Sequence, residues 1–413
     1  MKKSIRVLAL IAALPGLALA DEATNTVTIY GVIDANVAAS TNTGAATTAG
    51  TGLVSVGPGP GSTRTVLGQG LFQGSRWGIK GARDFGDGNK AIFNLEGGVY
   101  LGTGVIDQQG QIFGRQAWVG LENARWGQLT LGRTYGTFSD AIGSGDVFGE
   151  NHGNEVLYKP VGPGNTAGNY GGSNGQENTF FYNYSGLRWD NSVKYRGKFN
   201  NVTLGAQHAS GKDTGADMYA ASIGYDNTET LKATVSIQDE QDSTGKTHKD
   251  IVIAGQFKAT PVIQLYSFYM QSKFDAGFAN VTKFANVPGS ANGGTGTTAT
   301  STNSELSGPA FAREDDVFNL SIKYTLNPSW DLIGTYYNDR ASNVAAAGDS
   351  GTRNTYMAIA DYFLDKKTDL YVAVAHSTLS GAVAGANSAA AGMFATAGIS
   401  NTSLYTAGIR YRF

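Results

Sequence analysis

The sequence contains no cysteine among its 413 residues, so it can form neither disulfides nor a thiolate metal site. Histidine is almost as scarce. The only four are His152, His208, His248 and His376, and no two have the i, i+4 spacing of a helical metal site. Charged residues make up 15% of the chain and the formal net charge is −2, so nucleic acid is not an expected partner. We therefore expect no cofactor, no metal and no nucleic-acid function.

Long hydrophobic runs are also missing, and the mean hydropathy is −0.20, which excludes a helical membrane protein. The one apolar stretch is at the N-terminus, where Lys2, Lys3 and Arg6 precede residues 7–19 and a small-residue site follows at Ala18-Leu19-Ala20. This order predicts a secretory signal peptide over residues 1–20, because the apolar run is too short for a membrane anchor. The remainder, 21–413, is predicted to be one exported domain.

Glycine and aromatic residues are abundant: there are 57 glycines, and aromatics make up 11% of the chain. At the C-terminus, residues 401–413 alternate an apolar, aromatic face ending in Tyr411 and Phe413 with a face that carries Arg410 and Arg412. Residues 219–225 and 356–362 each have one face that begins and ends with tyrosine. Aromatic side chains at both ends of an apolar face are typical of strands that cross a bilayer.

The whole chain divides into short alternating segments that predict strands. We expect sixteen of them near residues 27–39, 70–83, 89–101, 112–122, 127–135, 187–197, 202–210, 217–226, 230–239, 249–258, 261–273, 314–326, 330–339, 353–363, 369–379 and 401–413. Tight links such as Asn327-Pro328-Ser329 alternate with long polar stretches such as 136–178 and 274–313. The fold class is therefore all-β: a 16-stranded antiparallel transmembrane β-barrel with short periplasmic turns and long external loops.

Several motifs resemble the general diffusion porins of Gram-negative outer membranes, especially the trimeric, 16-stranded type of beta-proteobacteria. They are Val27-Thr28-Ile29-Tyr30-Gly31-Val32-Ile33-Asp34, Ser75-Arg76-Trp77-Gly78-Ile79-Lys80-Gly81, Gly114-Arg115-Gln116-Ala117-Trp118-Val119-Gly120-Leu121, Gly127-Gln128-Leu129-Thr130-Leu131-Gly132-Arg133, Arg188-Trp189-Asp190-Asn191-Ser192-Val193-Lys194-Tyr195 and the terminal Phe413. The resemblance implies a homotrimer in the cell outer membrane. It also implies a water-filled channel through which ions and small hydrophilic solutes diffuse passively.

In that family the third external loop folds into the barrel and sets acidic residues opposite a ladder of arginines. By this resemblance the acidic side is Asp146 and Glu150, although here Gly149 stands where the family has proline. The basic wall is Arg76, Arg115 and Arg188, with Lys80 on the same strand face as Arg76. An arginine facing lipid at the bilayer midplane costs about 2–4 kcal/mol, which independently favours lumen-facing positions.

The resemblance also implies partners. Tyr411 and Phe413 match the terminal signal that barrel-assembly machinery recognises, and the outer wall is expected to contact outer-membrane lipid and lipopolysaccharide. The acidic run Glu314-Asp315-Asp316 is interpreted as a solvated loop edge at the start of a strand, with lumen-facing charge or divalent-cation binding as alternatives.

Three other functions stay open at this point. An outer-membrane hydrolase would need a nucleophile, a base and an orienting acid in one site, and the scattered histidines give no such arrangement. A secreted adhesin with a β-sandwich would explain the polar loops but not the terminal phenylalanine. A channel selective for one class of substrate has the same sequence pattern as a general pore, because lumen contacts depend on the fold.

Overall fold

The computed structural model describes residues 25–41, 63–102, 104–149, 188–210, 217–242, 244–278, 311–343, 347–382 and 400–413. The strands in this part of the chain are β1 (Asn25–Thr41), β2 (Thr63–Gln69), β3 (Arg76–Asp84), β4 (Lys90–Tyr100), β5 (Val105–Ile106), β6 (Gln116–Asn123), β7 (Gly127–Tyr135), β8 (Arg188–Phe199), β9 (Val202–Ala209), β10 (Asp217–Asp226), β11 (Leu231–Gln241), β12 (Thr247–Thr260), β13 (Ile263–Phe274), β14 (Arg313–Asn327), β15 (Trp330–Ser342), β16 (Ser350–Phe363), β17 (Thr368–Gly381) and β18 (Asn401–Arg412). The two helices there are α1 (Asp107–Gly110) and α2 (Thr137–Gly143), and neither is long and apolar enough to span a bilayer.

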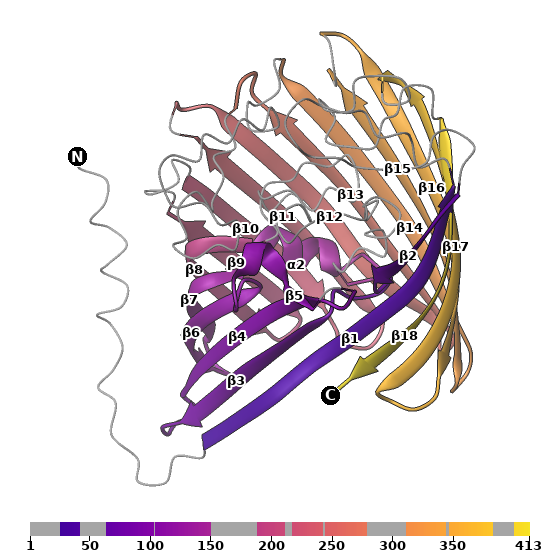
Figure 1. Ribbon diagram of the computed structural model, residues 1–413. Coiled ribbons are helices and arrows are strands. Elements are labelled where there is room, and N and C mark those ends of the chain that lie inside the picture. Colours follow the sequence, from indigo (N-terminus) through magenta and orange to yellow (C-terminus); the bar gives the residue numbers. More distant parts are fainter. Residues whose placement is uncertain are drawn as a thin grey trace, which may run out of the picture.

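Consecutive wall strands pair antiparallel, and the sheet closes where β18 pairs with β1 (Figure 1). β2 and β3 both pair with β1, the first with residues 35–41 and the second with residues 25–32, so together they make one strand of the wall. The short β5 pairs with the end of β4. The described residues thus form the predicted closed barrel of sixteen wall strands, which leaves no unpaired sheet edge in the bilayer.

Side-chain alternation explains why these segments form a barrel wall. On β10 the outward residues Tyr219, Ile223 and Tyr225 are exposed, whereas Met218 and Ala220 are buried on the inner side. The inner faces of other strands carry buried polar residues. A soluble sandwich would show the reverse pattern, with its apolar faces in the core. An apolar exterior with a polar interior requires lipid outside.

The connections alternate as predicted. Asn327 and Trp330 bracket one of the tight turns, and Phe363 and Thr368 bracket another. At the other end of the barrel, β13 ends at Phe274 and β14 begins at Arg313, which agrees with the predicted long loop. Residues 1–20, which carry the predicted signal peptide, lie outside the described residues.

The predicted second strand, residues 70–83, is only partly right. Strand structure occurs at β2 and β3, but residues 70–75 leave the ladder and oppose only residues 33–34 of β1. The Asp34 carboxylate holds this inserted segment, because its Oδ2 accepts hydrogen bonds from the backbone N–H groups of Phe72 (3.1 Å) and Gln73 (2.8 Å). A side chain at Gly70 would collide with Asp34, so this position requires glycine.

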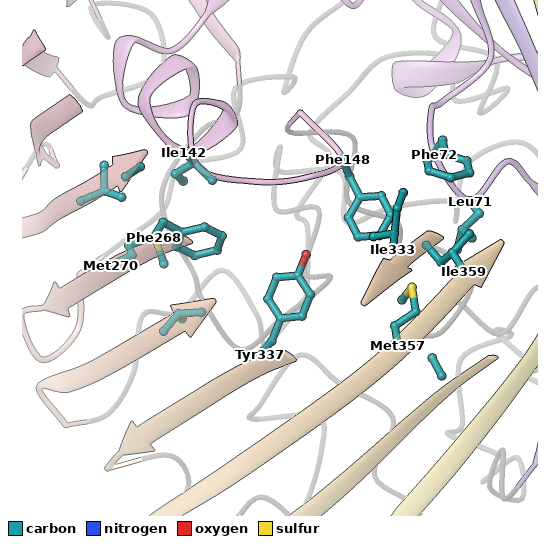
Figure 2. Close-up of a cluster of buried hydrophobic side chains, with 14 of the residues drawn as sticks. Leu71, Phe72, Ile142, Phe148, Phe268, Met270, Ile333, Tyr337, Met357 and Ile359 are labelled. Carbon is teal, nitrogen blue, oxygen red and sulfur yellow. The ribbon is translucent and has the colours of Figure 1, made fainter. Parts of the chain in front are cut away.

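The third loop folds into the barrel, as the resemblance to the porin family implied. Ile142 of α2 and Phe148 beyond it belong to a buried apolar cluster that also includes Leu71, Phe72 and inner-wall residues of β12–β18 (Figure 2). Phe72 and Phe148 meet with ring centroids 5.8 Å apart. The cluster therefore joins the 70–75 segment, the third loop and the inner wall.

Candidate functional site

Three arginines from different wall strands converge near the start of the third loop. Arg76 begins β3, Arg115 immediately precedes β6, and Arg188 begins β8. They surround one tyrosine and one glutamate, which also lie on the inner face of the barrel wall. These are Tyr135, at the end of β7, and Glu96, on β4. We call Arg76, Arg115 and Arg188 the arginine cluster.

Tyr135 is the common partner of two members of the cluster. Its hydroxyl accepts a hydrogen bond from Arg115 Nη2 at 2.7 Å and one from Arg188 Nη2 at 3.1 Å. The Arg188 guanidinium also lies over the Tyr135 ring, 4.7 Å from its centroid. One neutral side chain thereby holds two like charges close together.

Glu96 is the carboxylate within the cluster. Its Oε1 accepts a hydrogen bond from Arg115 Nε at 2.9 Å, and its Oε2 lies 3.9 Å from Arg76 Nε. Oε2 also accepts a hydrogen bond from the Tyr30 hydroxyl at 2.7 Å. Glu96 is only 4% exposed, so its charge is neutralised by the arginines and faces little solvent.

The remaining predicted basic residue, Lys80, is exposed and lies on the inner face of β3, where it pairs in register with Asn94 of β4. Its ammonium group is 5.0 Å from the centroid of the Tyr30 ring. Tyr30 donates a hydrogen bond to Glu96, so it links Lys80 to the arginine cluster. Its charge is the one most open to a passing solute among the four predicted basic residues.

On the acidic side, Asp146 is buried and its Oδ1 accepts hydrogen bonds from the Tyr337 hydroxyl at 3.1 Å and from the Phe148 N–H at 3.2 Å. Tyr337 is on β15, and Figure 2 shows its hydroxyl pointing toward the loop. Asp146 thus ties the third loop to a wall strand remote from the arginine cluster in strand order. Glu150, the other predicted acid, lies outside the described residues.

The third loop is also fixed at its beginning. Asp140 of α2 forms ion pairs with Lys194 (2.5 Å) and Arg196 (2.8 Å) of β8. The Gln207 side chain of β9 accepts a hydrogen bond from the N–H of Thr137 at 2.7 Å. Beyond the helix, Gly145 lies so close to Ser267 O that a Cβ there would be 2.2 Å away. The loop is thus held against the wall from both of its described ends.

The chain terminus completes the wall. The N–H of Phe413 donates to Gly31 O at 3.1 Å, and the Phe413 ring covers Gly31 on the outer face. Tyr411 and Phe413 lie outward with 46% and 41% of their surface exposed, and their ring centroids are 6.1 Å apart. The terminal residues therefore seal the β18–β1 seam.

Sequence reasoning missed Glu96, Tyr135 and Tyr30. Glu96 was detectable in principle, because it shares the inner face of β4 with Asn94 and Ile92. It also missed the ion pair between Arg133 Nη1 and Asp190 Oδ1 at 2.5 Å. No cluster of three or more histidine, aspartate or glutamate residues suited to a metal ion occurs in the part of the chain that the structure describes.

A closed wall with an apolar exterior, an inward loop and an internal charged cluster defines an outer-membrane channel. Residues 7–382 match the family description "Gram-negative porin". The chain belongs to the Gram-negative porin family, is located in the outer membrane, and forms a channel for passive diffusion. This confirms the resemblance seen in the motifs.

Individual relatives agree. An outer membrane porin protein of Bordetella pertussis is 38% identical over 153 residues, which cover 37% of this chain and 38% of that protein. Outer membrane porin protein 32 of Delftia acidovorans is 28% identical over 289 residues, covering 66% of this chain and 70% of that protein. The structure of an anion-selective porin from Comamonas acidovorans matches in fold with a TM-score of 0.65 and 20% identity, covering 94% of this chain and all of that one.

Proposed function

We propose that the arginine cluster and Lys80 form the basic wall of the channel's constriction, and that the channel prefers anions. The observation that carries this proposal is the convergence of three guanidinium groups on Tyr135 and one carboxylate, Glu96. The local charge balance is positive because Glu96 offsets only one of the three. The Comamonas protein with the similar fold is named as anion-selective, which supports the same sign of selectivity.

The arginine cluster acts on solutes mainly through its electrostatic field and less through direct contact. Arg115 and Arg188 are 4% and 7% exposed, so a solute meets little of their surface. Charges in low-dielectric surroundings are weakly screened, and a narrow aqueous passage beside them concentrates anions. Exposed Lys80 provides a direct contact on the same wall. Apolar solutes are slowed because they cannot replace the oriented water near these charges.

Asp146 serves in this proposal chiefly to anchor the loop, because its carboxylate is engaged with Tyr337 and Phe148. Neutralising it would then loosen the loop as well as change the local charge. Glu150 is proposed as an acidic residue at the constriction on the basis of the family resemblance.

We also propose that residues 1–20 are removed as a signal peptide during export and that residues 21–413 assemble as a homotrimer. Large outward side chains such as Val27 (69% exposed) and Val119 (57% exposed) on the N-terminal wall strands offer an apolar face for subunit contact. Recognition of Tyr411 and Phe413 by barrel-assembly machinery and contact of the outer wall with lipopolysaccharide belong to the same proposal.

Liposome swelling tests the anion preference directly. Liposomes containing the refolded protein are diluted into solutes of similar size that are anionic, neutral or cationic. The proposal predicts the fastest entry for the anion, and a smaller anion-to-cation ratio for Arg115→Gln and Arg188→Gln. Equal ratios for the wild type and both variants would contradict it, and entry of one solute class alone would indicate a substrate-selective channel.

A further inference from the structure

On the periplasmic side of the arginine cluster, the inner wall places a cation and an aromatic ring in one row. Lys80 of β3 is the direct partner of Asn94 on β4, and Asn94 is the direct partner of Trp118 on β6. The three residues share the inner face, because Val119, which follows Trp118, is exposed on the outer face. The backbones of Lys80 and Trp118 are about 10 Å apart at the usual strand spacing.

The ammonium group of Lys80 is accessible to a solute. Lys80 is exposed, and no carboxylate among the described residues lies within 4.0 Å of its Nζ. Its nearest aromatic support is Tyr30, whose hydroxyl lies 2.8 Å from Asn94 Oδ1 and donates to Glu96 Oε2 at 2.7 Å. Lys80 therefore presents to the lumen a positive charge that no described carboxylate neutralises by contact.

The Trp118 indole is the aromatic surface of this row. Its Nε1 donates a hydrogen bond to Gln116 Oε1 at 2.9 Å, which fixes the ring along the wall. Trp118 is half-buried, and no aromatic ring or cation among the described residues stacks on it. The other four tryptophans face outward, lie in a turn or are buried; they are Trp77, Trp330, Trp126 and Trp189. Trp118 thus offers an unoccupied aromatic face inside the channel.

The wall next to this row is small and apolar. Ala82, Ile92 and Gly120 occupy the next inner positions of β3, β4 and β6 toward the periplasmic turns, and they are partners in register. Their side chains form no hydrogen bonds with water, so a solute ring can displace that water at little cost. The row lies four residues beyond Arg76 on β3, about 13 Å along the strand. A solute that has passed the arginine cluster therefore reaches this part of the wall next.

We propose that Lys80 and Trp118 form a weak binding site for aromatic carboxylates, of which benzoate is the simplest. The carboxylate pairs with the Lys80 ammonium group while the ring stacks on Trp118. An aliphatic anion of the same size makes only the first contact, and a neutral ring makes only the second. Weak binding suits a channel, because a solute held tightly would not leave. The inference rests on the proposed anion preference and names one class of anion that the channel favours.

The test measures block of the single-channel current of the refolded barrel in a planar bilayer at neutral pH. Benzoate and cyclohexanecarboxylate are titrated separately, since both carry one negative charge on the same number of carbon atoms and only benzoate is aromatic. The variants are Trp118→Leu, Trp118→Phe and Lys80→Gln. The matched controls are Trp77→Leu, on the outer face of β3, and Lys258→Gln, an exposed lysine on the inner face of β12. Heat-modifiable migration on gels establishes that each barrel is folded.

The proposal predicts that benzoate half-blocks the wild type at about a fivefold lower concentration than cyclohexanecarboxylate does. Trp118→Leu should abolish this difference and Trp118→Phe should retain part of it, whereas Lys80→Gln should weaken block by both acids. Both controls should behave as the wild type does. Equal block of the wild type by the two acids would overturn the site, as would an unchanged benzoate preference in Trp118→Leu.

The reversal potential of the same channels in a potassium chloride gradient tests the proposed function separately. A channel that prefers chloride but shows no preference for benzoate would refute only this site. A channel that prefers potassium but is still blocked more strongly by benzoate would refute only the anion preference.

Discussion

At the scale of single residues, Glu96 sets the charge balance of the arginine cluster. It contacts Arg115 at 2.9 Å and Arg76 at 3.9 Å, so Glu96→Gln leaves their positive charge less compensated. We expect the reversal potential in a salt gradient to move toward stronger anion preference, and Arg115→Gln to move it the opposite way. Because removing one member of a buried ion pair costs about 3–5 kcal/mol, both barrels should also unfold more easily. Shifts of the same sign in both variants would refute this assignment.

A second prediction concerns the hydroxyl of Tyr135, which accepts hydrogen bonds from both Arg115 and Arg188. Tyr135→Phe keeps the ring under Arg188 but removes the shared acceptor. We expect noisier single-channel currents with the sign of selectivity retained, because the two guanidinium groups lose a fixed position. Tyr405→Phe, on the outer face of β18, is the control and should leave the currents unchanged. Identical noise in all three proteins would show that Tyr135 does not fix the cluster.

The site could be predicted only in part at this scale. Arg76, Arg115 and Arg188 were predicted because each stands in a block that resembles the family, and the structure brings all three together. Glu96 and Tyr135 were missed because their role depends on which strands become neighbours. Asp146 was predicted as an acid facing the arginines, whereas its hydrogen bond joins it to Tyr337, a contact 191 residues away in sequence. No local pattern specifies such a partner.

At the scale of elements, the 70–75 segment depends on Asp34. Oδ2 of Asp34 accepts from the N–H groups of Phe72 and Gln73, and Oδ1 accepts from the Tyr371 hydroxyl at 2.7 Å. Asp34→Asn leaves one acceptor oxygen, which cannot serve all three donors. We expect a loss of about 1–3 kcal/mol in unfolding free energy, measured by denaturant titration of the folded barrel. Glu229→Gln, in the exposed turn between β10 and β11, should change it by less than about 0.5 kcal/mol. An equal effect of the two substitutions would argue against the anchoring role of Asp34.

The third loop depends in the same way on Phe148, which is 4% exposed and packs on Phe72. Phe148→Ala should remove about 3–5 kcal/mol of local packing and free the loop beyond α2. Single-channel recordings are expected to show a larger and noisier conductance than the wild type. The exposed residue Phe311 provides the control, because Phe311→Ala removes an equal ring from outside this cluster. Unchanged conductance in Phe148→Ala would mean that the loop is held without this contact.

Element boundaries followed the sequence closely where alternation was unbroken. The predicted 353–363 segment lies within β16, and 369–379 lies within β17. The error at 70–83 has a physical cause, since Leu71 and Phe72 look like strand residues but are buried inside the lumen, where Asp34 and Tyr371 hold the backbone. These apolar residues lie in the lumen, so they depart from the alternation of apolar outward and polar inward residues that identifies the other strands.

At the scale of the whole molecule, closure depends on the last residue. Phe413 hydrogen-bonds to Gly31 through its backbone and covers that glycine with its ring. We expect Phe413→Ala to reduce the amount of folded barrel in the outer membrane of expressing cells, because both the seam and the proposed assembly signal are weakened. Refolding in detergent should be affected less, since it needs no machinery. Normal levels in cells would exclude a role for Phe413 in assembly.

The central claim is that this barrel is an open channel with an anion-preferring constriction. Its most direct test is the reversal potential of the wild-type protein in a planar bilayer under a potassium chloride gradient. We predict stepwise openings and a reversal potential whose sign shows that chloride is more permeant than potassium. In Arg115→Gln this potential should move toward zero. A reversal potential whose sign shows that potassium is the more permeant ion would contradict the account. So would the absence of channel currents in a bilayer that contains folded protein.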